Sequence, residues 1–130
     1  MCPFFSVIFD MNNIKQLHRL SEQAINQRDY VAAHGYCVAI IKAQPGHADA
    51  YFLLGIIHIE IGQITKAIKL IKKAITLQAN SEYYAYLAKC YSLVGNVTTT
   101  MEWVQKTPQK DIIHPLTLDT LGVALSRVGK

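Results

Sequence analysis

The chain has 130 residues, a length that suits one domain with a single hydrophobic core. Hydrophobic residues make up 51% of it and charged residues 17%, which excludes an intrinsically disordered polypeptide. The formal net charge of +4 is too small to indicate a dedicated nucleic-acid-binding arm, so we expect no nucleic-acid partner.

The first ten residues, MCPFFSVIFD, contain an apolar patch without the features of a secretory signal. The patch has no basic residues before it, and it is shorter than the ~7–15 apolar residues of a signal-peptide core. We therefore expect residues 1–13 to be an N-terminal extension that precedes the folded domain at residues 14–130. The role of residues 1–10 is left open.

The three cysteines, Cys2, Cys37 and Cys90, lie among apolar residues and form no CxxC pair. An odd number of cysteines in such surroundings indicates free thiols in a reducing compartment, and hence a cytoplasmic protein. The longest uninterrupted apolar run is 50–57. It falls well short of the ~20 residues that a membrane-spanning helix needs, so no membrane insertion is expected.

Taken in chain order, hydrophobic spacing and turn residues predict seven helices and no strands. Their expected positions are near 14–27, 30–43, 47–61, 64–77, 81–94, 97–106 and 115–128. Three consecutive threonines at 98–100 are poor helix formers, so the hairpin that contains them is expected to be the least regular. The stretch 106–115, KTPQKDIIHP, is predicted to be mostly loop.

A leucine followed by a small residue recurs every 33 or 34 residues along the chain. The four pairs are Leu20 and Ser21, Leu54 and Gly55, Leu87 and Ala88, and Leu121 and Gly122. Glycines follow in phase at Gly62 and Gly95, and alanines at Ala33 and Ala67. This pattern predicts helical hairpins in which the small residues let two helices approach closely and the glycines end the first helix of each. A single hairpin cannot bury its apolar face, so the hairpins are expected to stack.

The best unit is Tyr51-x2-Leu54-Gly55-x2-His58, followed by Gly62 and Ala67. It resembles the tetratricopeptide repeat signature, W-x2-L-G-x2-Y then A-x3-F over about 34 residues. The resemblance covers residues 14–130 and implies an all-α fold, a right-handed superhelical stack of antiparallel hairpins with about three and a half repeats. Its units are expected near 14–47, 48–80, 81–114 and, incomplete, 115–130. The first unit departs from the family at Ser21 and Arg28, where a small residue and glycine are usual.

No catalytic motif is present, and no two of the five histidines are spaced as metal ligands. His58 is expected to be a hydrogen-bonded core histidine, and Cys37 and Cys90 to be core residues. We therefore expect no enzyme activity, no cofactor and no metal site.

In the tetratricopeptide repeat family the concave face is lined by first-helix positions. The resemblance places a peptide-binding groove at Lys15, His18, Glu22, Phe52, Ile56, Ile59, Lys89 and Asp119. Phe52, Ile56 and Ile59 are spaced as one apolar stripe, which suits an amphipathic or extended peptide. The alternative is that the protein covers this stripe itself, for example with residues 4–9.

These features favour a protein–protein interaction module that binds a peptide or protein segment in its groove. The alternative is the N-terminal repeat region of a larger bacterial enzyme, such as a sulfotransferase or glycosyltransferase, that serves scaffolding or self-association. Self-association through the open ends of the solenoid is a further possibility. Residues His18 and Glu22 stand where a family subclass carries a lysine–asparagine clamp for acidic chaperone tails, which argues against that function.

Overall fold

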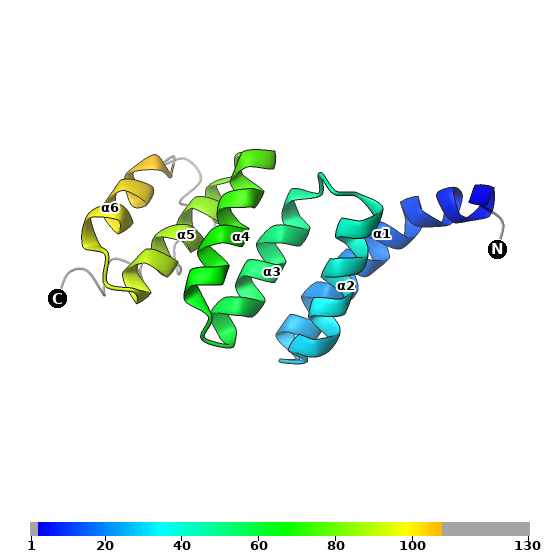
Figure 1. Cartoon of the computed structure of the whole chain (residues 1–130), viewed down its shortest axis with the longest axis horizontal. Helices are drawn as coiled ribbons and strands as arrows, with labels where there is room; N and C mark the ends of the chain where they lie inside the picture. The colour runs from blue at the N-terminus through cyan, green and yellow to red at the C-terminus, as the bar shows by residue number, and fades with distance from the viewer. Residues whose placement is uncertain (1–2, 108–130) are drawn as a thin grey trace.

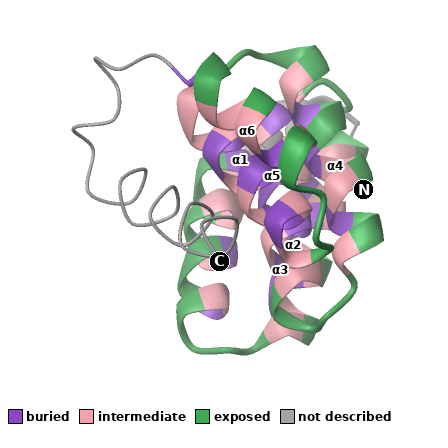
Figure 2. Cartoon of the chain, turned by 90° about the vertical axis from the view of Figure 1, so that its left-hand side faces the viewer, coloured by how far each residue is buried: buried purple, intermediate pink, exposed green. Residues whose placement is uncertain are grey.

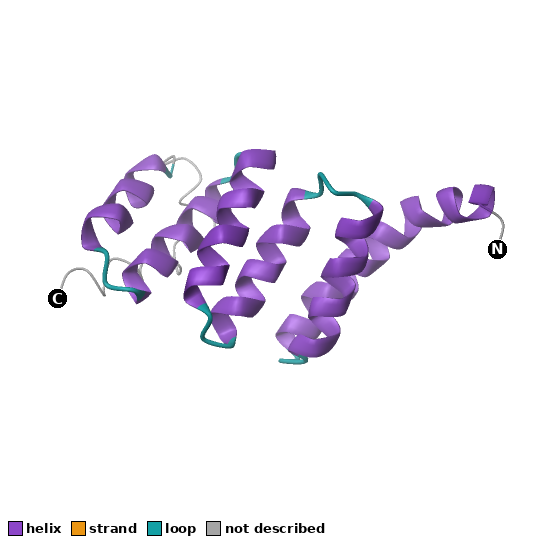
Figure 3. Ribbon diagram, in the orientation of Figure 1, coloured by secondary structure: helices purple, strands orange, loops and turns teal. Residues whose placement is uncertain are grey.

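The computed structural model describes residues 3–107, and the side chains of residues 13–107. Within this part the chain forms helices and no strand, as predicted (Figures 1 and 3). The helices are α1 (Pro3–Asn26), α2 (Tyr30–Ala43), α3 (Ala48–Glu60), α4 (Ile64–Leu77), α5 (Ser81–Leu93) and α6 (Val97–Lys106). Successive pairs form three antiparallel hairpins that stack side by side into a helical-repeat solenoid (Figure 1).

Several helix boundaries follow from local signals. Side chains of Asp29, His47, Asn80 and Asn96 accept hydrogen bonds from backbone N–H groups in the first turns of α2, α3, α5 and α6. Gly62 and Gly95 end α3 and α5 with φ of 84° and 81°, the left-handed conformation that glycine adopts without steric cost. Arg28 takes the same place after α1 with φ of 61°, although it has a side chain.

The predicted start of the first helix was wrong. α1 begins at Pro3 rather than near residue 14, because no glycine or interior proline interrupts the segment between Pro3 and Asn26. The other five helices lie within one residue of their predicted bounds at each end, and α6 forms in spite of its threonines. The predicted helix at 115–128, the incomplete fourth unit, most of the predicted loop, and Asp119, Leu121 and Gly122 lie outside the described residues.

The hairpin cores are built from the predicted repeat positions. Ser21, Gly55 and Ala88 on the first helices and Ala33, Ala67 and Thr100 on the second helices are buried. Leu54 and Leu87 are buried beside them, whereas Leu20 is half-buried. The two hydroxyls are satisfied within their own helices: Ser21 Oγ donates to Leu17 O at 2.8 Å, and Thr100 Oγ1 donates to Asn96 O at 2.7 Å. These bonds explain how polar residues are accommodated at close-packed positions.

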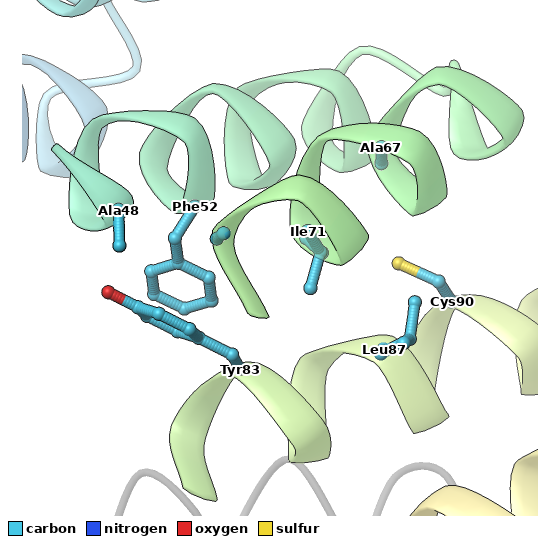
Figure 4. Packing of buried hydrophobic residues seen from close by; sticks show 8 residues of the cluster. Ala48, Phe52, Ala67, Ile71, Tyr83, Leu87 and Cys90 are labelled. Carbon is cyan, nitrogen blue, oxygen red and sulfur yellow. The ribbon is translucent and has the colours of Figure 1, made fainter. Parts of the chain in front are cut away.

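Between the second and third hairpins lies an apolar cluster that includes Phe52, Ile71, Tyr83, Leu87 and Cys90 (Figure 4). Figure 2 shows that the buried residues gather mainly towards the middle of the stacked helices, with exposed residues in the turns and at helix ends. Among the described residues, no helix combines the length and apolar character required to cross a membrane.

Candidate functional site

Two neighbouring hollows lie against the first helices of the hairpins. The larger, of about 610 Å³, is lined by residues of α1, of α3 and of the loop before α3, and we call it the histidine hollow; they include Lys15, His18, Arg19, His47 and Asp49. The second, of about 460 Å³, crosses all three hairpins, and we call it the acidic groove. Its lining residues are Glu22, Ile25, Asn26, Arg28, Tyr30, Asp49, Phe52, Leu53, Ile56, Glu60, Glu82 and Tyr86. The two hollows share Glu22 and Asp49.

The floor of the acidic groove is apolar and rigidly packed. Phe52 is 3% exposed, and its ring lies 4.5 Å from the Tyr83 ring and 5.1 Å, edge to face, from the Tyr86 ring. Figure 4 shows the Phe52 and Tyr83 rings against each other between α3 and α5. Aromatic pairs in these geometries add to the stability gained by burial, so this contact ties the second hairpin to the third.

A chain of polar side chains crosses the three hairpins between the two hollows. His18 Nδ1 lies 2.9 Å from Glu22 Oε1 on the same helix, and His18 Nε2 bonds Asp49 Oδ2 on α3. The Tyr83 hydroxyl of α5 donates to the other oxygen of Asp49 at 2.8 Å. Asp49 is therefore held from both sides, and one carboxylate links α1, α3 and α5.

These contacts shift the ionisation of the linked groups. The hydrogen bond to Asp49 raises the pKa of His18 above its usual value, against the opposing effect of burial. Burial raises the pKa of Asp49, but the hydrogen bonds from His18 and Tyr83 outweigh it, so that the pKa of Asp49 lies below its usual value. Burial and the bond to Asp49 raise the pKa of Tyr83 strongly. The link is thus a histidine–aspartate hydrogen bond, which is an ion pair while His18 is protonated, and the tyrosine hydroxyl donates to the other carboxylate oxygen.

The structure does not bring all the predicted groove residues together in one hollow. Lys15, His18 and Glu22 line the histidine hollow together, while Phe52 and Ile56 line the acidic groove with Glu22. Ile59 is half-buried against the apolar cluster and is not one of the lining residues of the groove. Lys89 Nζ lies 5.6 Å above the centre of the Tyr86 ring. Asp119 lies outside the described residues.

Within the predicted apolar stripe, Phe52 is buried, whereas Ile56 and Ile59 are half-buried. The rings of Tyr83 and Tyr86 cover the Phe52 side chain, so that it supports the groove floor from within the core. Sequence reasoning missed Tyr83 and Tyr86. The signal available was the tyrosine-rich stretch SEYYAY at 81–86, but which of its rings face α3 depends on how the hairpins stack.

In the described part of the chain, Cys37, Cys90 and His58 lie in inert surroundings. Cys37 and Cys90 are fully buried, and burial raises the pKa of their thiols to about 11 and about 12. His58 Nδ1 lies 2.8 Å from Leu54 O, which confirms the predicted hydrogen bond, but the side chain is half-buried rather than part of the core. In the part of the chain that the structure describes, no three His, Cys, Asp or Glu side chains are grouped so that they could hold a metal ion.

Stacked hairpins with a groove across their first helices define a helical-repeat solenoid of the kind that presents a binding face. The family model of the tetratricopeptide repeat matches residues 24–90, just over half of the chain. The chain therefore belongs to the tetratricopeptide repeat family. No curated protein matches its sequence.

Several solved structures share the fold. An O-GlcNAc transferase mutant of Thermobaculum terrenum has a TM-score of 0.81 and 24% identity, over 89% of this chain but 22% of that one. The chain thus spans about a fifth of the transferase. The TPR2B domain of yeast Sti1, in a complex with pHsp70, has a TM-score of 0.78 and 16% identity, over 90% and 96% of the two chains. The Yersinia enterocolitica type III secretion chaperone SycD, in complex with a peptide of the translocator YopD, has a TM-score of 0.76 and 15% identity, over 91% of each.

Proposed function

We propose that the chain is a protein–protein interaction module that binds a peptide or protein segment in the acidic groove and has no catalytic role of its own. The observation that carries the proposal is the groove itself, about 460 Å³ in volume, with an apolar floor, a charged rim and walls from three hairpins. SycD and the TPR2B domain, which share this fold, were solved in complexes with a peptide and with pHsp70, and this supports the same use here. The buried thiols of Cys37 and Cys90 support a reducing, cytoplasmic location.

The half-buried side chains on the groove floor provide the contact surface for such a segment. Ile25, Ile56 and Tyr86 come from α1, α3 and α5, so a bound segment would run along the stacking direction and touch every hairpin. Because Phe52 and the polar link through Asp49 already hold these helices together, little rearrangement accompanies binding.

The test is a selection of random displayed peptides on the immobilised chain, followed by fluorescence anisotropy with the selected peptides. Ile56→Gln is expected to weaken binding by about tenfold or more. A tenfold change in affinity corresponds to about 1.4 kcal/mol, which is less than the burial of one aliphatic side chain contributes. Ile59→Gln is the matched control, because Ile59 lies one helical turn further along α3 and outside the groove lining. The proposal is overturned if no peptide is selected, or if both variants bind the selected peptides as the parent chain does.

A second candidate is that the chain is the N-terminal repeat region of a larger bacterial enzyme, where it serves scaffolding or self-association. The similarity to the O-GlcNAc transferase, of which the matching solenoid is 22%, favours this candidate. The mass of the endogenous protein, read with an antibody against this chain, distinguishes the two: a mass of 14.6 kDa excludes the larger enzyme.

A further inference from the structure

The acidic groove is richer in acidic side chains than the chain as a whole. Four of the nine acidic residues, Glu22, Asp49, Glu60 and Glu82, line it, in a protein whose formal charge is +4. Arg28 is the one lysine or arginine among its lining residues. The lysines of the second hairpin lie elsewhere: α4, which contributes no lining residue to the groove, carries Lys66, Lys69, Lys72 and Lys73.

Two carboxylates of the groove accept hydrogen bonds from tyrosine hydroxyls. Tyr83 donates to Asp49 at 2.8 Å, and the Tyr30 hydroxyl lies 3.5 Å from Glu60 Oε2. The hydrogen bonds to Asp49 keep its pKa below the usual value in spite of burial. His18 bonds Glu22 and Asp49 from the side of the histidine hollow. Glu60 and Glu82 line the groove on α3 and α5.

The apolar floor and the acidic rim occur in one hollow. Phe52 and Leu53 are buried beneath it, Ile56 is half-buried, and Glu60 is exposed at the end of α3. In an extended peptide, successive side chains point to opposite sides. A segment that alternates apolar and basic residues would therefore place its apolar side chains on the floor and direct its basic ones towards the rim.

We propose that the acidic groove selects a cationic segment of another protein, an extended stretch in which lysine or arginine alternates with apolar residues. This inference rests on the proposed function and adds the chemistry of the partner. Charge complementarity carries it, because a groove with four carboxylates and one guanidinium disfavours acidic peptides and nucleic acids. The adjoining histidine hollow carries Lys15 and Arg19, so the basic part of the segment lies over α3 and α5 rather than along the part of α1 that carries these two residues.

The test uses the full chain and three fluorescein-labelled peptides in anisotropy measurements. The first is Ser-Lys-Leu-Lys-Leu-Lys-Ser, the second has glutamate in place of each lysine, and the third has serine in place of each leucine. We expect the first to bind most tightly, and its affinity to fall as salt rises from 0.05 to 0.3 M, since exposed charges are screened. Glu60→Gln and Glu82→Gln are each expected to weaken it about threefold or more, and Arg28→Gly to strengthen it.

Glu102→Gln is the matched control, because Glu102 is an exposed glutamate on α6 that does not line the groove. It is expected to leave the affinity unchanged. Equal losses in Glu60→Gln, Glu82→Gln and Glu102→Gln would overturn the inference, since they would show a response to net charge alone.

The remaining outcomes separate the inference from the proposed function. If the glutamate peptide binds as tightly as the lysine peptide and Ile56→Gln weakens both, the groove binds peptides but the cationic selection is wrong. The same holds if neither binds while the display-selected peptides do. If no peptide of either kind binds, the proposed function itself fails. A dimer in sedimentation that Glu60→Gln dissociates would identify a second copy as the occupant, and a groove cross-link to residues 108–130 would identify the chain's own C-terminal segment; either result overturns the inference.

Discussion

Gly55 of α3 and Ile71 of α4 approach each other so closely that a methyl group on Gly55 would lie 2.6 Å from Ile71 Cγ1. The same position would be 3.5 Å from Ala67 O, so the small residue pair Gly55 and Ala67 sets the distance between the two helices. This contact explains why a leucine followed by a small residue is the strongest feature of the repeat.

The first prediction concerns this approach. Gly55→Ala is expected to lower the free energy of unfolding by up to about 2 kcal/mol, because overpacking costs about 1–3 kcal/mol and the gain in helix propensity offsets about 1 kcal/mol of it. Gly35→Ala on α2 meets nothing within 4 Å and is expected to raise stability by up to about 1 kcal/mol. Urea unfolding followed by circular dichroism measures both, and changes of the same sign would contradict the assigned role of Gly55.

Arg28 provides the second prediction, because it occupies the left-handed position that Gly62 and Gly95 occupy in the other hairpins. A side chain costs about 1–2 kcal/mol there, and glycine costs about 0.5–1 kcal/mol through its freedom in the unfolded chain. Arg28→Gly is therefore expected to be neutral or to stabilise by up to about 1 kcal/mol. Arg19→Gly, in the interior of α1, is expected to destabilise by about 1 kcal/mol. Urea unfolding measures both variants. Similar losses of unfolding free energy in Arg28→Gly and Arg19→Gly would show that Arg28 is not strained by its left-handed conformation.

Phe52 gives the third prediction, which tests its place in the core. Phe52→Ala is expected to cost about 3–5 kcal/mol, because it removes the ring packed on Tyr83 and Tyr86 and leaves a cavity. The melting temperature should therefore fall well below that of the parent chain. Val97→Ala, at a side chain that is 50% exposed, is the control and is expected to change stability by less than about 0.5 kcal/mol. An unchanged melting temperature in Phe52→Ala would show that this side chain is not part of the core.

The fourth prediction is the pH dependence of the His18–Asp49 pair. The pKa of His18 is raised above 6.5, so its contribution to stability is complete below that pH and is lost as pH rises through the raised pKa. The pKa of Asp49 is lowered below 3.8, so its contribution is present above that pH and is lost as pH falls through the lowered pKa. The pair therefore stabilises the fold most between about pH 4 and 6.5.

Melting temperatures measured between pH 5.5 and 9 test the histidine side of this window. The parent chain is expected to lose stability as pH rises, and His18→Gln to flatten that slope. His34→Gln, at an exposed histidine of α2, is the control and is expected to keep the parent slope. The charged neighbours of the pair are Glu22 and the nearby His47, whose ring lies 5.8 Å from that of His18. A slope unaltered by His18→Gln would assign the pH dependence to groups outside the pair.

The fifth prediction concerns thiol reactivity. In a Cys2→Ser variant, Cys37 and Cys90 are the remaining thiols, and both are fully buried with raised pKa values of about 11 and about 12. We expect slow reaction with a disulfide reagent at pH 8 in the native state and rapid reaction of both thiols in urea. Rapid native reaction of either thiol would show that its helix opens readily.

Much of the fold was predictable because its signals are local. Capping residues such as Asn80 and Asn96, turn glycines such as Gly62, and the spacing of apolar residues lie within a few positions of the boundaries they set. The start of α1 was mispredicted for the same reason, since the residues before Asn13 contain no boundary signal except Pro3. The period of the small residues also indicated that the hairpins stack.

The groove could not be predicted from local signals, because it is formed by contacts between different hairpins. His18, Asp49 and Tyr83 belong to three different hairpins, and their contact follows from the rotation and distance between successive units. The same stacking decides that Phe52 is covered by Tyr83 and Tyr86 while Ile56 still lines the groove. The sequence by itself determined the helices and the family. Only the tertiary structure decided which first-helix side chains join the core and which face a partner, because packing between hairpins sets their exposure.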